Sequence, residues 1–423
     1  MRSTAYQQAA YSEPTTVEKQ ILHWVHSQQA SNVERLQQLV NCNSGSFNIA
    51  GIQAVGEQVS CFFSSLTQHI QQVPLPPWQR MGFDGVIHSQ QLADAWLIQH
   101  RLDAPLQILL TGHLDTVFPM DSSFQQARFL NKKQLLGPGA ADMKGGLLVM
   151  LTALQALEQH PDAAQIGWTV LLNTDEEIGS PGSASLLQEE AGKNHLGLIY
   201  EPALPDGNLA GERKGSGNFT FRIEGKSAHA GREPEKGRNA INLAAELILE
   251  LNKLNGQRTG LTLNTGIIQG GETTNQVPNL TIFKFNIRIQ NPEDAQWCLQ
   301  TLHEIESTYN QYEGYKVTLH GQFGRMPKRF DPEHLALYNL VAHCAQQLNF
   351  PLSWSATGGC CDGNNLSAAG LVNVDTLGVR GNFIHSSNEY MEVDSLTERS
   401  QLSALLLFQL AKEGLPQPKV GEL

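Results

Sequence analysis

Residues 108–116, Ile108-Leu-Leu-Thr-Gly-His113-Leu-Asp115-Thr116, decide how the rest of the chain is interpreted. The branched apolar run that ends at Gly112 predicts a strand buried in a sheet, and ligand sites of open α/β sheets lie at the carboxyl ends of such strands. Because residues two apart in an extended segment face the same way, Asp115 can accept a hydrogen bond from one ring nitrogen of His113 and leave the other for a metal. Taken alone, this pattern is more typical of an ordinary hydrogen-bonded pair, so a metal site depends on the polar residues that follow.

Length and composition limit the classes of protein to consider. A chain of 423 residues exceeds the size at which one core usually keeps growing, so we expect two domains rather than one large α/β domain. Lys and Arg total 29 against 41 Asp and Glu, which gives a formal charge of −12. This acidity argues against nucleic acid or an anionic membrane as the partner.

Cysteine usage and the amino-terminal residues indicate the compartment. The six cysteines lack any Cys-X-X-Cys spacing and are typical of reduced thiols. The amino-terminal residues are polar and contain no apolar signal-peptide core, and no apolar run is long enough to span a bilayer. We therefore expect a soluble, cytoplasmic protein.

Alternating helical and strand patterns predict an α/β domain that is formed by two separate parts of the chain. Apolar spacing of three and four predicts helices, and short apolar runs predict strands. The helices are expected at residues 16–27, 32–40, 52–66, 147–157, 332–348 and 395–410, and the strands at residues 95–100, 107–111, 168–172, 196–200 and 371–377. Such alternation predicts a mostly parallel sheet with helices on both faces.

The order of elements changes between these two parts. The patterns predict strand 218–224, helix 239–254, strands 261–268 and 280–290, helix 292–309 and strand 316–320. The order β-α-β-β-α-β is that of the ferredoxin-like α+β unit, which forms a two-layer domain of its own. The predicted organisation is an α/β domain of residues 1–213 and 326–423, interrupted by an inserted domain of residues 214–325.

Acidic residues follow the expected strands. Residues 137–146, Gly-Pro-Gly-Ala-Ala-Asp142-Met-Lys-Gly-Gly, place one aspartate in a glycine-rich loop before a helix, where it is either a ligand or only the helix N-cap. Residues 173–180, Asn-Thr-Asp-Glu176-Glu177-Ile-Gly-Ser, place three consecutive acids after a buried strand, and their mutual repulsion indicates a cation that offsets it. Glu201 follows the next strand, so several carboxylates are expected at one edge of the sheet.

Six motifs, in order along the chain, resemble the dinuclear zinc exopeptidase and deacylase family. They are Thr-Gly-His113-Leu-Asp115-Thr, Gly-Pro-Gly-Ala-Ala-Asp142-Met-Lys-Gly-Gly, Asn-Thr-Asp-Glu176-Glu177-Ile-Gly-Ser, Tyr-Glu201-Pro, Ser-Ala-His229-Ala-Gly and His385-Ser-Ser-Asn-Glu389-Tyr. The family includes glutamate carboxypeptidase, to which the motifs look most similar, acetylornithine deacetylase, succinyl-diaminopimelate desuccinylase and the aminoacylases. The resemblance implies a zinc-exopeptidase-like α/β fold whose inserted domain is a lid and a dimerisation domain.

The resemblance also implies two zinc ions per chain. Asp142 would bridge the ions, with His113 and Glu201 completing one site and Glu177 and His385 completing the other. Nitrogen and oxygen ligands suit zinc, although oxygen-rich sites discriminate poorly against Co²⁺ and Mn²⁺.

Two further acids carry roles that the resemblance implies. Asp115 would be the carboxylate that orients His113, and Glu176 would be the general base. Adjacent Glu176 and Glu177 cannot easily both bind one ion, so one can hold the metal while its neighbour takes a proton from water.

Three residues of the inserted domain carry the remaining implied roles. His229 resembles the family histidine that reaches across a dimer interface and stabilises the oxyanion in the partner's active site, whereas its alternative is a surface or capping histidine. Asn275 and Arg288 look like the family's substrate-binding pair, and the Arg288 fork suits a carboxylate. The alternative for Arg288 is a solvated residue on an edge strand. A homodimer through the inserted domain follows from the resemblance.

The chain departs from the family in the loop Cys360-Cys361-Asp362, where relatives commonly carry a small hydroxyl residue before the aspartate. In the family this loop lies near the substrate, so the departure bears on side-chain specificity. Buried structural thiols are favoured over a cysteine nucleophile or thiolate ligand, because no base lies near the cysteines in the sequence.

The predicted activity is hydrolysis of an amide bond in a small or dipeptide-like substrate that bears a carboxylate, by a glutamate-carboxypeptidase-like metallopeptidase. An N-acyl amino acid deacylase is the alternative, with the same fold and metal chemistry. A non-catalytic dimeric binding protein is disfavoured because every implied ligand and the base are present.

Overall fold

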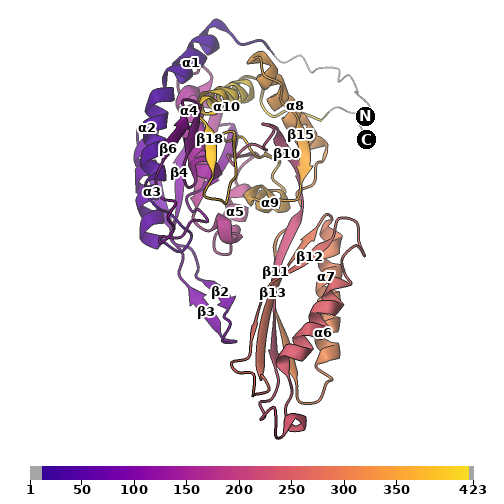
Figure 1. Cartoon of the computed structure of the whole chain (residues 1–423). Coiled ribbons are helices and arrows are strands. Elements are labelled where there is room, and N and C mark those ends of the chain that lie inside the picture. Colours follow the sequence, from indigo (N-terminus) through magenta and orange to yellow (C-terminus); the bar gives the residue numbers. More distant parts are fainter. Residues whose placement is uncertain (1–11, 419–423) are drawn as a thin grey trace.

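The structure, a computed structural model, describes residues 12–418 and has a larger α/β part and a smaller inserted part (Figure 1). The larger part is built on a six-stranded sheet in the order β1-β4-β8-β5-β9-β16. β5 pairs in parallel with β8 and β9, and β9 pairs in parallel with β16, whereas β1 and β4 run antiparallel. The predicted mostly parallel sheet is therefore confirmed. Its strands are β1 (His69–Val73), β4 (Ala95–His100), β5 (Leu106–His113), β8 (Ile166–Asn173), β9 (Leu196–Ile199) and β16 (Asn373–Val374).

Helices cover both faces of this sheet. Ile108 and Leu110 of β5 lie in the core that the larger group of helices shares, whereas Leu109 packs in a second core with residues of α5 and α9. Such alternation is expected of a strand that is buried on both sides. The larger group is α1 (Thr16–Ser27), α2 (Gln29–Val40), α3 (Ile49–Phe63), α4 (Gly145–Leu157), α8 (Pro332–Gln347) and α10 (Val393–Glu413), and the opposite face carries α5 (Ala184–Ala191) and α9 (Asp362–Ala368).

One apolar stretch corrects the prediction that no run is long enough to span a bilayer. Residues Ala140–Leu157 pass that test by length and composition, but 94% of the stretch is buried inside the protein. It includes α4, which packs against α10 and the central sheet, so its apolar character is that of a core helix.

Three small sheets flank the central one, and the sequence patterns did not predict them. Their strands are short, and most lack the continuous buried apolar run that marks the central strands. They are the pair β2 (Trp78–Met81) and β3 (Ile87–Gln90), the parallel pair β10 (Leu209–Arg213) and β15 (Trp354–Thr357), and the sheet of β17 (Gly381–Asn382), β18 (Tyr390–Glu392), β7 (Gln134–Leu136) and β6 (Arg128–Asn131).

Residues 214–325, here called the insert, form a four-stranded antiparallel sheet in the order β12-β13-β11-β14, with α6 and α7 on one face. The insert has its own core, in which Phe221 and Phe285 stack at 5.7 Å between ring centroids. The observed order is β-α-β-β-α-β, as the sequence predicts. Its elements are β11 (Gly215–Glu224), α6 (Ala240–Asn252), β12 (Thr262–Gly270), β13 (Leu280–Ile289), α7 (Pro292–Tyr309) and β14 (Lys316–Arg325).

The chain crosses between the two parts at two adjacent points. Backbone N–H groups of Arg213 and Lys328 each donate to the other's carbonyl oxygen, at 3.1 and 3.0 Å. Both side chains pair with the buried carboxylate of Asp375, Arg213 Nη2 at 2.9 Å and Lys328 Nζ at 2.9 Å. The predicted limits of the insert, residues 214 and 325, lie beside this cluster of charges.

A hairpin of the larger part reaches the uncovered face of the insert sheet. It consists of β2 and β3 and extends beside β11 and β13 in Figure 1. Lys284 of β13 donates from Nζ to the carbonyl oxygen of Met81 at 2.7 Å and lies over the ring of Phe83. The uncovered face of the insert therefore points toward the larger part.

Candidate metal centre

Three neighbouring strands bring polar residues to one edge of the central sheet. His113 ends β5, Glu176 and Glu177 lie in a short helical turn after β8, and Glu201 follows β9. Because β5 lies between β8 and β9 and the three strands are parallel, their carboxyl ends meet at the same edge.

Two loops bring Asp142 and His385 to the same place. Asp142 lies in the turn η1 (Ala140–Lys144), and the N-cap of α4 is Lys144, so Asp142 is not the helix cap. His385 follows β17 with a left-handed φ of 63°. Its side chain is 52% exposed, whereas that of His113 is 1% exposed.

The five side chains form two triads that share Asp142. In the first triad, His113 Nε2 lies 3.2 Å from Asp142 Oδ1 and 3.9 Å from Glu201 Oε1. In the second triad, His385 Nε2 lies 3.2 Å from both Asp142 Oδ2 and Glu177 Oε2. The potential ligand atoms of each triad lie within 4.8 Å of one another.

The electrostatics of this centre favour bound cations. Burial and, after it, neighbouring carboxylates raise the pKa of Glu177 to about 8 and that of Glu201 well above its ordinary value. Burial acts on Asp142 in the same direction, but the imidazoles of His113 and His385 bring its pKa below the usual range. Cations between these carboxylates would offset their repulsion, and imidazole nitrogens with carboxylate oxygens are a donor set that suits zinc. The residues present therefore fit two metal ions.

Asp115 contacts His113 differently from the sequence prediction. His113 Nδ1 lies 2.9 Å from the backbone carbonyl oxygen of Asp115 and 3.5 Å from its carboxylate Oδ1. The strand ends at His113, so the extended spacing that the prediction assumes does not continue. The carboxylate instead accepts from Ser46 Oγ at 2.7 Å and from the backbone N–H groups of Glu176 and Glu177 at 3.2 Å each. Asp115 thus holds the turn that carries the two glutamates.

Glu176 lies outside both triads and pairs with a residue of the insert. Its Oε1 is 2.7 Å from Nη2 of Arg325, which ends β14. Burial raises the pKa of Glu176 to about 7, although the Arg325 guanidinium acts to lower it. A buried carboxylate whose pKa lies near neutrality is suited to accept and return a proton.

The third acid of the run has a local structural role. Asp175 accepts from the backbone N–H groups of Gly182 and Ser183, at 2.6 and 3.1 Å, and from Ser183 Oγ. It stabilises the turn before α5.

The three predicted residues of the insert are not gathered at the triads. His229 is exposed, and its Nδ1 accepts from the backbone N–H of Gly231 at 3.1 Å. The carbonyl oxygen of Asn275 accepts from the N–H of Ala230, so His229 and Asn275 lie on adjacent loops of the insert. Within residues 12–418, no hydrogen bond or ion pair joins His229 or Asn275 to either triad.

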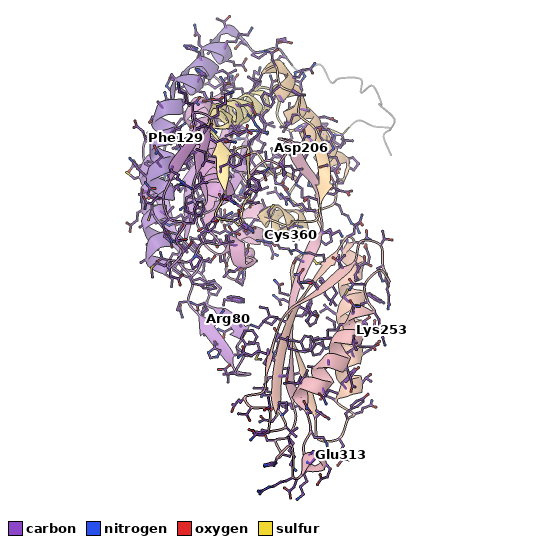
Figure 2. All side chains as sticks on the ribbon, viewed as in Figure 1. Arg80, Phe129, Asp206, Lys253, Glu313 and Cys360 are labelled. Atoms are coloured by element: carbon purple, nitrogen blue, oxygen red, sulfur yellow. The ribbon has the colours of Figure 1, made fainter. Side chains whose placement is uncertain are left out.

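Arg288 lies where the insert meets the larger part. It is half-buried on β13, which is an inner strand, so the alternative of an edge strand is wrong. Its Nε donates to Asn286 Oδ1 at 2.9 Å, and its Nη1 donates to the sulfur of Cys360. Figure 2 shows Cys360 in the loop that faces the insert.

The two adjacent cysteines differ in environment. Cys361 is buried, its sulfur accepts from the N–H of Gly363 at 3.3 Å, and burial raises the pKa of its thiol well above the ordinary value. These contacts agree with a structural thiol at the start of α9. Cys360 is half-buried beside Arg288 and forms no disulfide.

Sequence reasoning missed Arg325 and Ser46, which contact Glu176 and Asp115. Arg325 also donates to Ser180 Oγ at 2.8 Å and lies 3.3 Å from Asp362 Oδ1. No local pattern marks Arg325, because its importance comes from where β14 returns to the larger part. Ser46 lies in a turn-rich stretch between two helices. That stretch is the one feature of the sequence that could have pointed to Ser46.

Comparison with known proteins was made for sequence and for fold. Residues 109–409 match peptidase family M20/M25/M40. Carboxypeptidase G2 of Pseudomonas sp. (strain RS-16) is 27% identical over 392 residues, which are 90% of each chain. A succinyl-diaminopimelate desuccinylase of Nitrosospira multiformis is 27% identical over 365 residues, 82% of this chain and 92% of that protein.

Solved structures share the fold. An M20 family metallo-carboxypeptidase of Sulfolobus solfataricus superposes with a TM-score of 0.66 at 16% sequence identity, over 90% of this chain and 99% of that one. Because the match covers 90% of this chain, it extends beyond the larger part into the insert.

Proposed function

This chain belongs to peptidase family M20/M25/M40, a family of hydrolases, and from this premise we propose that it is a two-zinc amidohydrolase. Its reaction would remove a carboxyl-terminal amino acid or an N-acyl group from a small substrate that bears a carboxylate. The observation that carries the proposal is Asp142, whose two carboxylate oxygens each lie 3.2 Å from a different imidazole. A carboxylate shared between two nitrogen ligands is an arrangement that can hold a pair of metal ions.

One ion would be held by His113, Glu201 and Asp142. The other would be held by His385, Glu177 and Asp142. Zinc is the proposed metal, and Co²⁺ or Mn²⁺ are the alternatives because the sites are rich in oxygen. Such ions lower the pKa of water toward about 7 and polarise a carbonyl group.

The proton transfers are assigned to Glu176. Its raised pKa of about 7 suits a carboxylate that takes a proton from water and passes it to the departing amine. Asp115 would keep Glu176 in place, because its carboxylate accepts the backbone N–H of that residue at 3.2 Å. The donor to the developing oxyanion would be His229.

A substrate carboxylate would be bound by Arg288 together with Asn275. The Arg288 guanidinium faces the larger part and donates to an amide and a thiol, and no carboxylate of residues 12–418 forms an ion pair with it. The similarity to carboxypeptidase G2 supports removal of a carboxyl-terminal amino acid. The desuccinylase similarity supports the alternative, an N-acyl amino acid deacylase.

We further propose that the insert is a lid and that two copies pair through it. β12 is an edge strand, and Ile267 and Ile268 on it are 52% and 51% exposed. On the neighbouring α6, Leu249 is 67% exposed. An exposed apolar edge strand can pair with another chain, and pairing with a second copy would cover these side chains. Such a dimer would also give the exposed His229 a site in its partner.

A cytoplasmic location is proposed from the cysteines. All six are free, and a reducing compartment keeps thiols in that state.

A substrate panel tests the activity. The full chain is stripped of metal with a chelator, reloaded with Zn²⁺, and assayed against N-acyl amino acids, dipeptides and conjugates with a terminal glutamate. We expect turnover that is lost on chelation and restored by the metal, with substrates that lack a carboxylate turned over poorly. Turnover that survives complete metal removal, or none on any amide after reloading, would contradict the proposal.

A further inference from the structure

We propose that Glu389 is the positioning residue that fixes Asp142 relative to His385 and thereby sets the metal affinity of the triad Asp142, Glu177 and His385. The inference rests on the proposed two-metal centre and concerns a residue that contacts neither imidazole. Glu389 is a buried carboxylate to which the proposed mechanism gives no role.

The Glu389 side chain is enclosed by one loop. Its Oε1 accepts from the backbone N–H groups of Ala141 and Asp142, at 3.0 and 3.1 Å, and its Oε2 accepts from that of Gly139 at 3.3 Å. Glu389 is 1% exposed, so these N–H groups, and not water, solvate its carboxylate oxygens. Hydrogen bonds from three N–H groups of a four-residue segment to one buried side chain hold that segment in place.

The main chain of Glu389 ties the same loop to His385. Its N–H donates to the carbonyl oxygen of Ser386 at 3.0 Å, which closes the turn directly after His385. Its carbonyl oxygen accepts from the N–H of Gly137 at 3.1 Å. One residue therefore joins two segments that are about 250 positions apart in the sequence and that supply Asp142 and His385.

Strand pairing alone does not fix Asp142. β18 pairs with β7, but β7 ends at Leu136, before the loop that carries the aspartate. Lys144, two residues after Asp142, does not take over this role either, because its Nζ donates to the carbonyl oxygens of Leu39 and Cys42. The hydrogen bond from the Asp142 N–H to Glu389 thus acts directly on the backbone of the shared ligand.

The two triads depend on Glu389 to different degrees. In the second triad, Asp142 is bonded to Glu389 directly, and His385 is tied to it through the turn that Glu389 closes at Ser386. In the first, His113 and Glu201 follow the central strands β5 and β9, and only Asp142 is attached. We therefore expect the loss of the Glu389 carboxylate to weaken the second metal site more than the first.

The substitution Glu389→Gln tests this inference. A neutral amide keeps the shape, but its NH₂ group must face a backbone N–H that now lacks an acceptor. The metal-free full chain is titrated with Zn²⁺ against a competing chelator, so the readout is affinity and not activity. We expect one of the two zinc affinities to fall by about 10- to 100-fold, as for other residues that orient metal ligands, and the other to change less.

Glu158→Gln is the matched control. This carboxylate also accepts several hydrogen bonds, from Arg101 and from Trp168 Nε1, but it lies at the end of α4 away from both triads. We expect it to lower the melting temperature without changing either zinc affinity. If Glu389→Gln does the same, Glu389 is only structural and the inference is overturned.

Two further outcomes are separable. If the Gln variant does not fold, Glu389→Asp, which retracts the carboxylate by one CH₂ group, replaces it, and wild-type affinity for both ions in that variant overturns the inference. If the wild-type chain itself binds no pair of zinc ions, the proposed function fails before Glu389 is tested.

Discussion

The larger part and the insert present their predicted site residues in opposite ways. In the larger part, the triad residues meet within one chain, and His113, Asp142 and Glu201 are buried at the ends of packed elements. In the insert, His229 and Asn275 are exposed on two adjacent loops, and within residues 12–418 no hydrogen bond joins them to the triads, while Arg288 faces the junction. The metal half of the site is thus assembled by the fold of a single chain. The substrate half depends on where the insert lies and on what it meets there.

One contact joins the insert directly to the residues around the metal centre. Arg325 comes from the last strand of the insert and pairs with Glu176 at 2.7 Å, next to the triads. The proposed general base therefore contacts the insert, and any movement of the insert would change its surroundings. Substitutions can separate residues that act within the larger part from residues that act through the insert.

The largest effect is expected for Glu176→Gln. The amide cannot take a proton from water, and general acid–base catalysis contributes about 10²–10⁴-fold, so kcat should fall by that factor. Because Glu176 belongs to neither triad, zinc content should stay near that of the wild type. Elemental analysis and steady-state kinetics check both expectations, and retained turnover would remove Glu176 from its assigned role.

His229→Ala should have the next largest effect. Loss of an oxyanion donor typically costs about 10²–10³-fold in kcat, and metal content should not change because His229 contacts neither triad. The structure leaves His229 on an exposed loop, so we expect its site to be in a second copy.

A mixed dimer decides where His229 acts. The His229→Ala chain keeps its metal ligands, and the His385→Ala chain keeps His229 while it loses a ligand of the second triad. If the sites are shared, mixing and refolding the two chains should restore part of the activity, with the dimer verified by sedimentation. Absence of recovery in a verified mixed dimer would mean that each chain completes its own site.

The difference between the two regions also explains which strands and site residues could be predicted from the sequence. Long apolar runs such as that ending at His113 report burial directly, so the central strands and the strand-end acids were found from pattern alone. The roles of Asp142 and His385 came from family resemblance, because two loops far apart in the sequence leave no periodic signal. The prediction for Asp115 was only partly right. Asp115 lies beside His113, but its carboxylate is 3.5 Å from His113 Nδ1 and accepts the N–H groups of Glu176 and Glu177 at 3.2 Å each.

Contacts across the two regions were beyond sequence reasoning. Arg325 meets Glu176 because β14 continues to residue 325, whereas the predicted strand ends at residue 320. The strands of the hairpin β2 and β3 are short and mostly exposed, so they leave no apolar run to recognise, yet the hairpin touches the insert through Lys284. Such contacts arise from the relative placement of two separately folded cores, which local propensity does not encode.

The smallest effect is expected for Arg288, which lies where the larger part and the insert meet. Arg288→Ala should raise KM for a carboxylate-bearing substrate by about 10- to 100-fold, the worth of hydrogen bonds to a charged group, while kcat and zinc content change little. Lys284→Ala is the matched control, because Lys284 lies on the same strand and the same face but contacts the hairpin through Met81. A substrate amide that lacks the carboxylate should be insensitive to Arg288→Ala. If Lys284→Ala raises KM as much as Arg288→Ala, the effect comes from displacement of the insert, and Arg288 is not the carboxylate receptor.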